Sequence, residues 1–164
     1  DRRFDREVVP EGRVANEWQL FEDRPGVYNA WDILPSFEDH RHPLGDAEPV
    51  EVVESGPVSA AVRITRSFRS SRAVQVIRLY SFAPRIDFET WVDWHEREKL
   101  LKVAFPLTVK AAHYTTDTSA GGFERPNNRN TSWEQARFEV PSHKWADVSE
   151  SGFGVALQIG RAHV

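Results

Sequence analysis

Apolar and polar residues alternate along much of this chain with a period of two, which is the pattern of β-strands with one apolar face. Rows of this kind cover residues 58–64, 86–94 and 101–107, and in the second row the opposite face is acidic. Residues 74–80 are apolar on both faces for part of their length, which predicts a more central strand. β-Branched and aromatic residues dominate these rows, as expected for strands.

Turn residues separate the rows at short spacing. Glycine, proline and serine gather at 55–57, 83–85 and 151–152, and residues 69–72 predict a hairpin connection. No segment shows a helical stripe with caps at both ends. The sequence therefore predicts an all-β fold, an antiparallel β-sandwich, in which the polar stretches 34–49 and 115–132 form long loops at a binding site or an interdomain contact.

Composition narrows the functional classes. Of 164 residues, 40% are hydrophobic, which is enough for a folded core, and the net charge is only −4. Basic residues are scattered among acidic ones, so we expect no nucleic-acid partner and no membrane surface. No apolar run approaches the roughly 20 residues that a membrane-spanning helix needs.

The two ends of the chain predict that it is a piece of a longer protein. Methionine is absent, even at position 1, and cysteine is absent too, which excludes disulfides and fits the reducing cytoplasm. The strand-like run 153–157 changes character at Gln158. Residues 159–164 back-translate to a sequence that resembles a sequencing adapter, so we expect native sequence over 1–157 and a non-native tail at 158–164.

Two histidine-containing motifs are candidates for chemistry. His40 and His42 would lie on one side of an extended segment and could form a metal pair, but two solvated loop histidines are the favoured interpretation. Asp93 and His95 share a strand face, where cross-strand pairing on a wet surface is favoured over a catalytic role.

Paired carboxylates, which a glycosidase needs, cannot be chosen from sequence spacing among 25 acidic residues. Asp23, Asp32 and Glu124 are the candidates beside predicted loops, although each could equally cap a turn or pair with arginine. Asn130 begins an N-glycosylation triplet, which has meaning only in a secretory pathway.

Three blocks of sequence resemble glycoside hydrolase family 38 α-mannosidases, and they cover nearly the whole chain in the family's order. The blocks are 16–25 with Ala30-Trp31-Asp32-Ile33, then Trp94-His95-Glu96 with 99–106, and finally Glu124-Arg125-Pro126, Asn130-Thr131-Ser132-Trp133, 136–140, 143–147 and 152–157. The departures are Tyr28 and Asn29 in the first block and Asn127, Asn128, Glu134 and Gln135 in the third.

This resemblance implies a non-catalytic segment of a retaining enzyme that removes terminal α-linked mannose from oligosaccharides. It implies a supersandwich-like, mutarotase-like β fold that is incomplete here and packs on a separate N-terminal α/β barrel, with remaining C-terminal strands elsewhere in the chain. That barrel would hold the aspartate nucleophile and a divalent metal, usually zinc, so we expect no catalytic residue, cofactor or metal ligand in this segment and no activity from it alone.

The resemblance also implies that some loops here rim the substrate cleft. The rim residues are expected to be Trp31, Asp32, Arg125, Asn130 and Trp133. A structural interdomain contact is an equal alternative for these loops. For the chain as a whole, the alternatives are a free-standing carbohydrate-binding module and a purely structural segment.

Overall fold

The computed structural model describes residues 1–28 and 31–160 of the chain. Asn29 and Ala30 of the first family block, and residues 161–164 of the predicted tail, lie outside the described residues. The elements in chain order are β1 (Glu17–Glu22), the 3₁₀ helix η1 (Pro35–Asp39), β2 (Arg41–His42), β3 (Glu51–Ser55), β4 (Ser59–Phe68), β5 (Ser71–Tyr80), β6 (Ile86–Asp93), β7 (Lys99–Ala104), β8 (His113–Thr118), β9 (Gly121–Pro126), the helix α1 (Ser132–Ala136), β10 (Trp145–Glu150) and β11 (Phe153–Gln158). The all-β antiparallel fold is confirmed.

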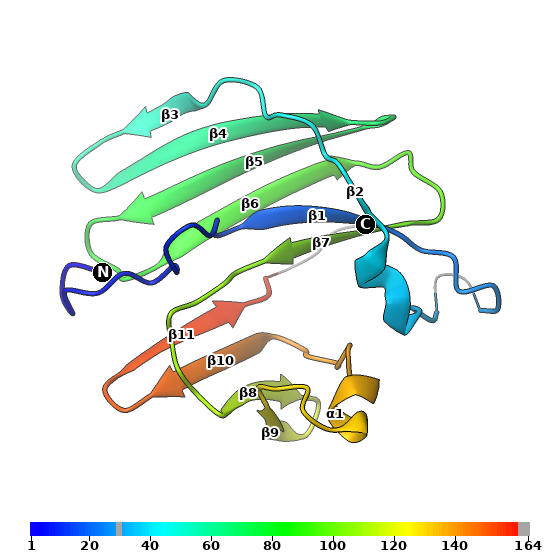
Figure 1. Ribbon diagram of the computed structural model, residues 1–164. Coiled ribbons are helices and arrows are strands. Elements are labelled where there is room, and N and C mark those ends of the chain that lie inside the picture. Colours follow the sequence, from blue (N-terminus) through cyan, green and yellow to red (C-terminus); the bar gives the residue numbers. More distant parts are fainter. Residues whose placement is uncertain (29–30, 161–164) are drawn as a thin grey trace. The chain divides into compact units, whose positions relative to one another are not determined.

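The chain divides into two compact units, residues 18–103 and residues 1–17 with 104–164. The 18–103 unit has a four-stranded sheet in the order β3-β4-β5-β6 and a three-stranded sheet in the order β2-β1-β7 (Figure 1). The long hairpin of β4 and β5 pairs from Ser59 with Tyr80 to Phe68 with Ser71. β5 also pairs with β6, so the predicted central strand at 74–80 is confirmed.

The core of this unit lies between its two sheets. Leu20 of β1 is 0% exposed and contacts Phe68 and Ala73 of the β4–β5 hairpin, which are 3% and 1% exposed. Partly buried side chains complete the cluster: Trp18, Leu44 and Leu101. Because the alternation of a strand sends every second residue to one face, Leu20 reaches the core that the four-stranded sheet presents.

The second unit contains a four-stranded sheet in the order β11-β10-β8-β9. A turn at Gly152, which has φ +84°, joins β10 to β11, and this turn was predicted from sequence. The N-terminal segment is tied to the same unit through Arg6. Its guanidinium forms an ion pair with Glu150 and donates a 3.0 Å hydrogen bond to the carbonyl of Thr108.

The prediction of a loop over residues 115–132 is wrong for most of that stretch. β8 and β9 pair from His113 with Pro126 to Thr118 with Gly121, so Gly121 and Gly122 belong to a hairpin. The strand was overlooked because β8 is polar, but threonine is β-branched and suits a strand. The predicted strand at 101–107 also ends early, at Ala104, two residues before Pro106, which lacks an N–H for pairing.

The structure also contains two short helices, which the sequence pattern did not predict. η1 begins at Pro35, and α1 begins after Thr131, whose side chain accepts a hydrogen bond from the N–H of Glu134. The Glu134 side chain in turn accepts one from the N–H of Thr131, which completes a capping box. The residue spacing of that box was visible in the sequence and was not used.

Candidate functional site

An open hollow lies beside the β8–β9 hairpin, over the segment that follows it. Its volume is about 500 Å³. We name it the hairpin pocket, and its described lining residues are Tyr114, Phe123, Arg125, Pro126, Asn127, Asn128, Arg129, Glu134, Arg137, Phe138 and Val140. Polar and aromatic side chains therefore meet in one concave surface, which is the composition of many small-molecule sites.

Arg125 is held in the wall of the hairpin pocket by two hydrogen bonds. Its Nε donates to Thr116 Oγ1 at 3.1 Å, and its Nη2 donates to the carbonyl of Pro141 at 3.1 Å. The guanidinium carbon also lies 4.9 Å from the centre of the Phe123 ring. Thr116 is only 1% exposed, so the anchor is rigid. A guanidinium has five N–H donors, and two are used in these bonds.

Helix α1 places Trp133 next to this pocket. The capping box holds the start of the helix, and the backbone N–H of Asn130 also donates to Glu134, at 2.9 Å. Trp133 is 74% exposed, and the guanidinium of Arg137 lies 5.7 Å from the centre of its ring. The structure therefore gathers Arg125, Asn130 and Trp133 in one region, although only Arg125 is part of the pocket lining.

Asp117 of β8 anchors the far end of the same segment, and sequence reasoning missed it. Its Oδ1 accepts hydrogen bonds from the backbone N–H groups of His143, Lys144 and Trp145, at 3.2, 2.6 and 2.9 Å. Burial alone would raise the pKa of this carboxyl. The three N–H donors outweigh that effect, and the pKa lies below its ordinary value. Asp117 thus locks the entry to β10 onto β8.

Trp31 and Asp32 lie in the other unit, in the long connection between β1 and β2. The carbonyl of Tyr28 accepts hydrogen bonds from the N–H groups of Trp31 and Asp32, at 2.9 and 3.0 Å. Asp32 Oδ1 accepts from the N–H of Ile33 at 3.0 Å. Trp31 is 89% exposed. Trp31 and Asp32 therefore present a flat aromatic surface beside a carboxylate.

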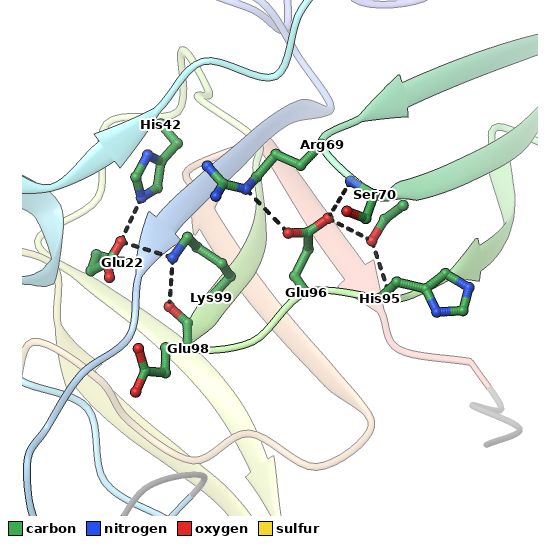
Figure 2. Close-up of polar contacts among 9 residues, drawn as sticks. Glu22, His42, Arg69, Ser70, His95, Glu96, Glu98 and Lys99 are labelled. Carbon is green, nitrogen blue, oxygen red and sulfur yellow. Dashed lines mark hydrogen bonds and ion pairs between the residues drawn. The ribbon is translucent and has the colours of Figure 1, made fainter.

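The two ends of that connection are pinned together by Glu22. Its carboxylate Oε2 lies 2.7 Å from His42 Nε2 and 2.9 Å from Lys99 Nζ (Figure 2). Lys99 also donates to the carbonyl of Glu98 at 3.2 Å. The Lys99 side chain is 6% exposed, so Glu22 serves as the counter-ion of a largely buried ammonium group.

The ionisation of Glu22 reflects these contacts. Its pKa is lowered from 4.5 to about 2, first by the hydrogen bond from Lys99 and then by that from His42. Burial acts in the opposite direction, and the charges of Lys99 and Arg24 add to the lowering. Glu22 is therefore a carboxylate at neutral pH.

Glu96, from the second family block, forms a similar tie between β4–β5 and the start of β7. Figure 2 shows its carboxylate accepting hydrogen bonds from Arg69 Nε and Ser70 N, at 3.1 and 2.8 Å. It also accepts from Ser71 Oγ at 2.9 Å, and that hydroxyl accepts from the N–H of His95. The Glu96 side chain is 6% exposed. This motif is thus explained by structure, because it closes the β4–β5 turn.

A second open groove, of about 730 Å³, follows the pinned ends of the β1–β2 connection. Its described lining is Glu22, Asp23, Arg24, Leu34, Ser36, Phe37, Asp39, His40, Arg41 and His42, and neither Trp31 nor Asp32 belongs to it. Within the described residues, Asp23 Oδ1 is a buried atom with no hydrogen-bond partner. This groove is polar, but the predicted rim residues stand outside it.

The histidine pair at 40 and 42 does not form a metal centre in the described structure. His42 is engaged with Glu22, while His40 lines the groove. Among residues 1–28 and 31–160, no group of three or more histidine, aspartate and glutamate side chains is arranged to hold a metal ion. Over the same residues, no helix is long and apolar enough to cross a membrane.

The remaining candidates sit on exposed surfaces. His95 Nε2 lies 2.9 Å from Asp93 Oδ1, with side chains 60% and 76% exposed, so the surface is wet, as predicted. The two residues pair with each other along one segment, whereas the prediction was a cross-strand pair. Glu124 of β9 is 71% exposed and lies 3.7 Å from His113. Asp23 and Asp32 belong to the other unit.

Comparison with known proteins gives one consistent result. The model for the glycosyl hydrolases family 38 C-terminal domain matches residues 1–163. Alpha-mannosidase 2C1 of Homo sapiens is 41% identical over 154 residues, which cover 93% of this chain and 15% of that protein. Alpha-mannosidase G of Dictyostelium discoideum is 35% identical over 96% of this chain and 15% of its own length. Alpha-mannosidase of Saccharomyces cerevisiae is 32% identical, with 87% and 14% covered. The chain thus spans about 15% of the length of these relatives.

Proposed function

Because this chain belongs to glycosyl hydrolase family 38 and matches its C-terminal domain, we propose that it is a non-catalytic segment of a retaining α-mannosidase. The parent enzyme would hydrolyse terminal α-linked mannose from oligosaccharides. All the relatives described above carry the name alpha-mannosidase, which supports this assignment. The rest of the same polypeptide is then the main partner of this segment, and a cytoplasmic location stays a prediction.

Within that enzyme, we propose that the hairpin pocket helps to shape the substrate cleft. The observation that carries this proposal is Arg125, held by Thr116 and Pro141 at the wall of an open hollow. Sugar hydroxyl groups need donors held at fixed positions, and a rigid guanidinium supplies them without an ordering cost. The exposed ring of Trp133 nearby offers a flat apolar face that suits the C–H surface of a sugar.

The catalytic metal that the family implies does not fit the residues of this segment. His42 is engaged with Glu22, and the described residues contain no cluster of ligands for an ion. We therefore assign the nucleophile and the divalent metal, usually zinc, to the part of the enzyme outside this chain. No reaction step is assigned to residues 1–164.

The test uses the full-length enzyme with Trp133→Ala and Arg125→Lys. Trp91→Ala is the matched control, because Trp91 is also exposed, at 57%, and lies on a different sheet. Loss of one sugar contact is expected to lower kcat/KM for a mannose oligosaccharide about tenfold, which is about 1.4 kcal/mol. The melting temperature should stay unchanged for Trp133→Ala, since this ring buries little surface.

Two outcomes would reject the cleft role. Wild-type kcat/KM in Trp133→Ala and Arg125→Lys would show that the hairpin pocket does not touch substrate. A fall in melting temperature that accompanies the fall in kcat/KM would mean that these residues form a structural interdomain contact. The same measurements of kcat/KM and melting temperature on Trp31→Ala and Asp32→Ala decide between the cleft role and the structural role for these two residues. Mannoside binding by the full-length protein without any hydrolysis would favour the alternative function of a carbohydrate-binding module.

A further inference from the structure

One face of the β3-β4-β5-β6 sheet carries a row of apolar side chains toward one end. Residues directly opposite each other in antiparallel strands share a face. Val52 pairs with Val62, which pairs with Ile77, and in the next row Ala60 pairs with Leu79, which pairs with Ile86. These six residues from four strands therefore form one surface, which we name the apolar end patch.

The apolar end patch is largely open to solvent. Val52 is 71% exposed, Leu79 is 53% exposed and Ile86 is 51% exposed. Val62 and Ile77 are half-buried. Single exposed apolar residues are normal on a protein surface, but a contiguous group of them over four strands marks an interaction surface.

The opposite face of the same sheet is charged, as expected for a surface that faces solvent. Cross-strand ion pairs cover it, formed by Arg63 with Glu51 and by Arg78 with Glu54. The register places Glu51, Arg63 and Arg78 on the face away from the patch, because each lies one position from a patch residue along its strand. A β-bulge between Val52 and Glu54 puts Glu54 opposite Ala61 on that same face. The sheet is thus amphipathic, and the apolar end patch is on its inward-facing side.

The same inward face is already covered at its other end. Ala73 lies on β5 in line with Ile77 and Leu79, and it is 1% exposed under the cluster that contains Leu20 of β1. Side chains of β1 and β7, among them Leu20 and Leu101, thus cover that end within the described residues. The apolar end patch continues the same core surface beyond the reach of these side chains.

We propose that the apolar end patch is an intramolecular interface, covered in the full-length protein by polypeptide outside residues 1–164. Two observations select this occupant over a separate partner: the patch is continuous with an established core, and relatives of this chain are covered over only about 15% of their length. The inference rests on the proposal that this segment works within a longer enzyme. It does not depend on the role of the hairpin pocket at the cleft.

The test is photo-crosslinking in the full-length protein with Leu79→p-benzoylphenylalanine. The matched control is Trp91→p-benzoylphenylalanine, because Trp91 is equally exposed at 57% and pairs with Val74 on the charged face of the same sheet. After irradiation, mass spectrometry identifies the captured peptide. We expect Leu79→p-benzoylphenylalanine to capture peptides outside residues 1–164 of its own chain and the control to capture none.

Other outcomes would overturn the proposal. Crosslinks only to peptides within residues 1–164 would make this segment its own cover, and crosslinks to a second copy or another protein would make the patch an external interface. Hydroxyl-radical footprinting of the unsubstituted full-length protein needs no variant to fold. Leu79 and Ile86 should be oxidised about tenfold more slowly than in free peptides, as expected for an interface core, and free-peptide rates would refute coverage. Mannosidase activity is scored separately, so a failed cleft assay leaves this result interpretable.

Discussion

Replacing Glu22 by glutamine tests the polar tie that pins the β1–β2 connection. The change keeps the size of the side chain and removes its charge. Lys99 Nζ, 2.9 Å away on a side chain that is 6% exposed, then loses its counter-ion. Removing one partner of such a pair is costly, because the other charge stays out of water without compensation.

The magnitude follows from the pKa of Glu22, which is lowered from 4.5 to about 2. A pKa lowered by about 2.5 corresponds to roughly 3.4 kcal/mol in favour of the ionised form. The Glu22 side chain is 22% exposed, so solvent screening reduces the expected cost to about 2 kcal/mol. That cost equals an increase of about 30-fold in the population of locally open states.

The assay is hydrogen exchange of the amides in β1 and β7, measured by mass spectrometry in the full-length protein at pH 7. Exchange in Glu22→Gln should be about 30-fold faster than in the wild type. Glu98→Gln is the control, because Glu98 is 45% exposed and shares Arg24 with Glu22. An equal and small effect of both substitutions would refute the argument that Glu22 holds a buried charge.

The difference in hydrogen exchange between wild type and Glu22→Gln should depend on pH in a definite direction. The folded-state pKa of Glu22 is depressed, so its stabilisation is fully present above pH 4.5. It is lost as the pH falls toward about 2, where the folded protein also binds the proton. The gap between wild type and Glu22→Gln should therefore close between these values, and a gap that persisted at the acid end would contradict the assignment.

Two further substitutions test the packing of each unit. Leu20→Ala removes a side chain that is 0% exposed, so it should lower the opening free energy of β1, measured by hydrogen exchange, by about 3 kcal/mol. The control is Val27→Ala, at a position that is 62% exposed, which should change this free energy by no more than about 0.5 kcal/mol. Asp117→Asn removes the charge that accepts three backbone hydrogen bonds, so the amides of residues 143–145 should exchange about tenfold faster at pH 7. Because the pKa of Asp117 is lowered, that effect should shrink in acid below its ordinary value, 3.8, and unchanged exchange at pH 7 would show that Asp117 does not anchor this segment.

The strands were predicted well where one local rule was sufficient. β4, β5 and β6 each carry the period-two pattern, and glycine or serine marks their turns. β8 was missed because its residues are polar, and the reason it is a strand is its pairing with β9 and β10. A polar strand is stabilised by its neighbours, and a single stretch of sequence does not show them.

The candidate site likewise contains residues that the sequence indicates and residues that only the fold brings together. Arg125, Asn130 and Trp133 were selected through resemblance, and the structure gathers them around one hollow and its helix. Asp117 supports that region and was not selected, because its three hydrogen bonds go to backbone groups 26 to 28 residues later in the chain. The spacing of these residues along the sequence does not predict such a contact.

The sequence by itself determined the all-β class, most of the strand and turn positions, and the family, because strand alternation and motif order are local properties of the chain. Tertiary structure alone decided which apolar surfaces are covered and which charges meet. Leu20 and Leu79 are equally apolar, yet one is 0% exposed and the other 53%. Burial depends on how far the second sheet extends over the first, and this follows from strand order and register between distant segments.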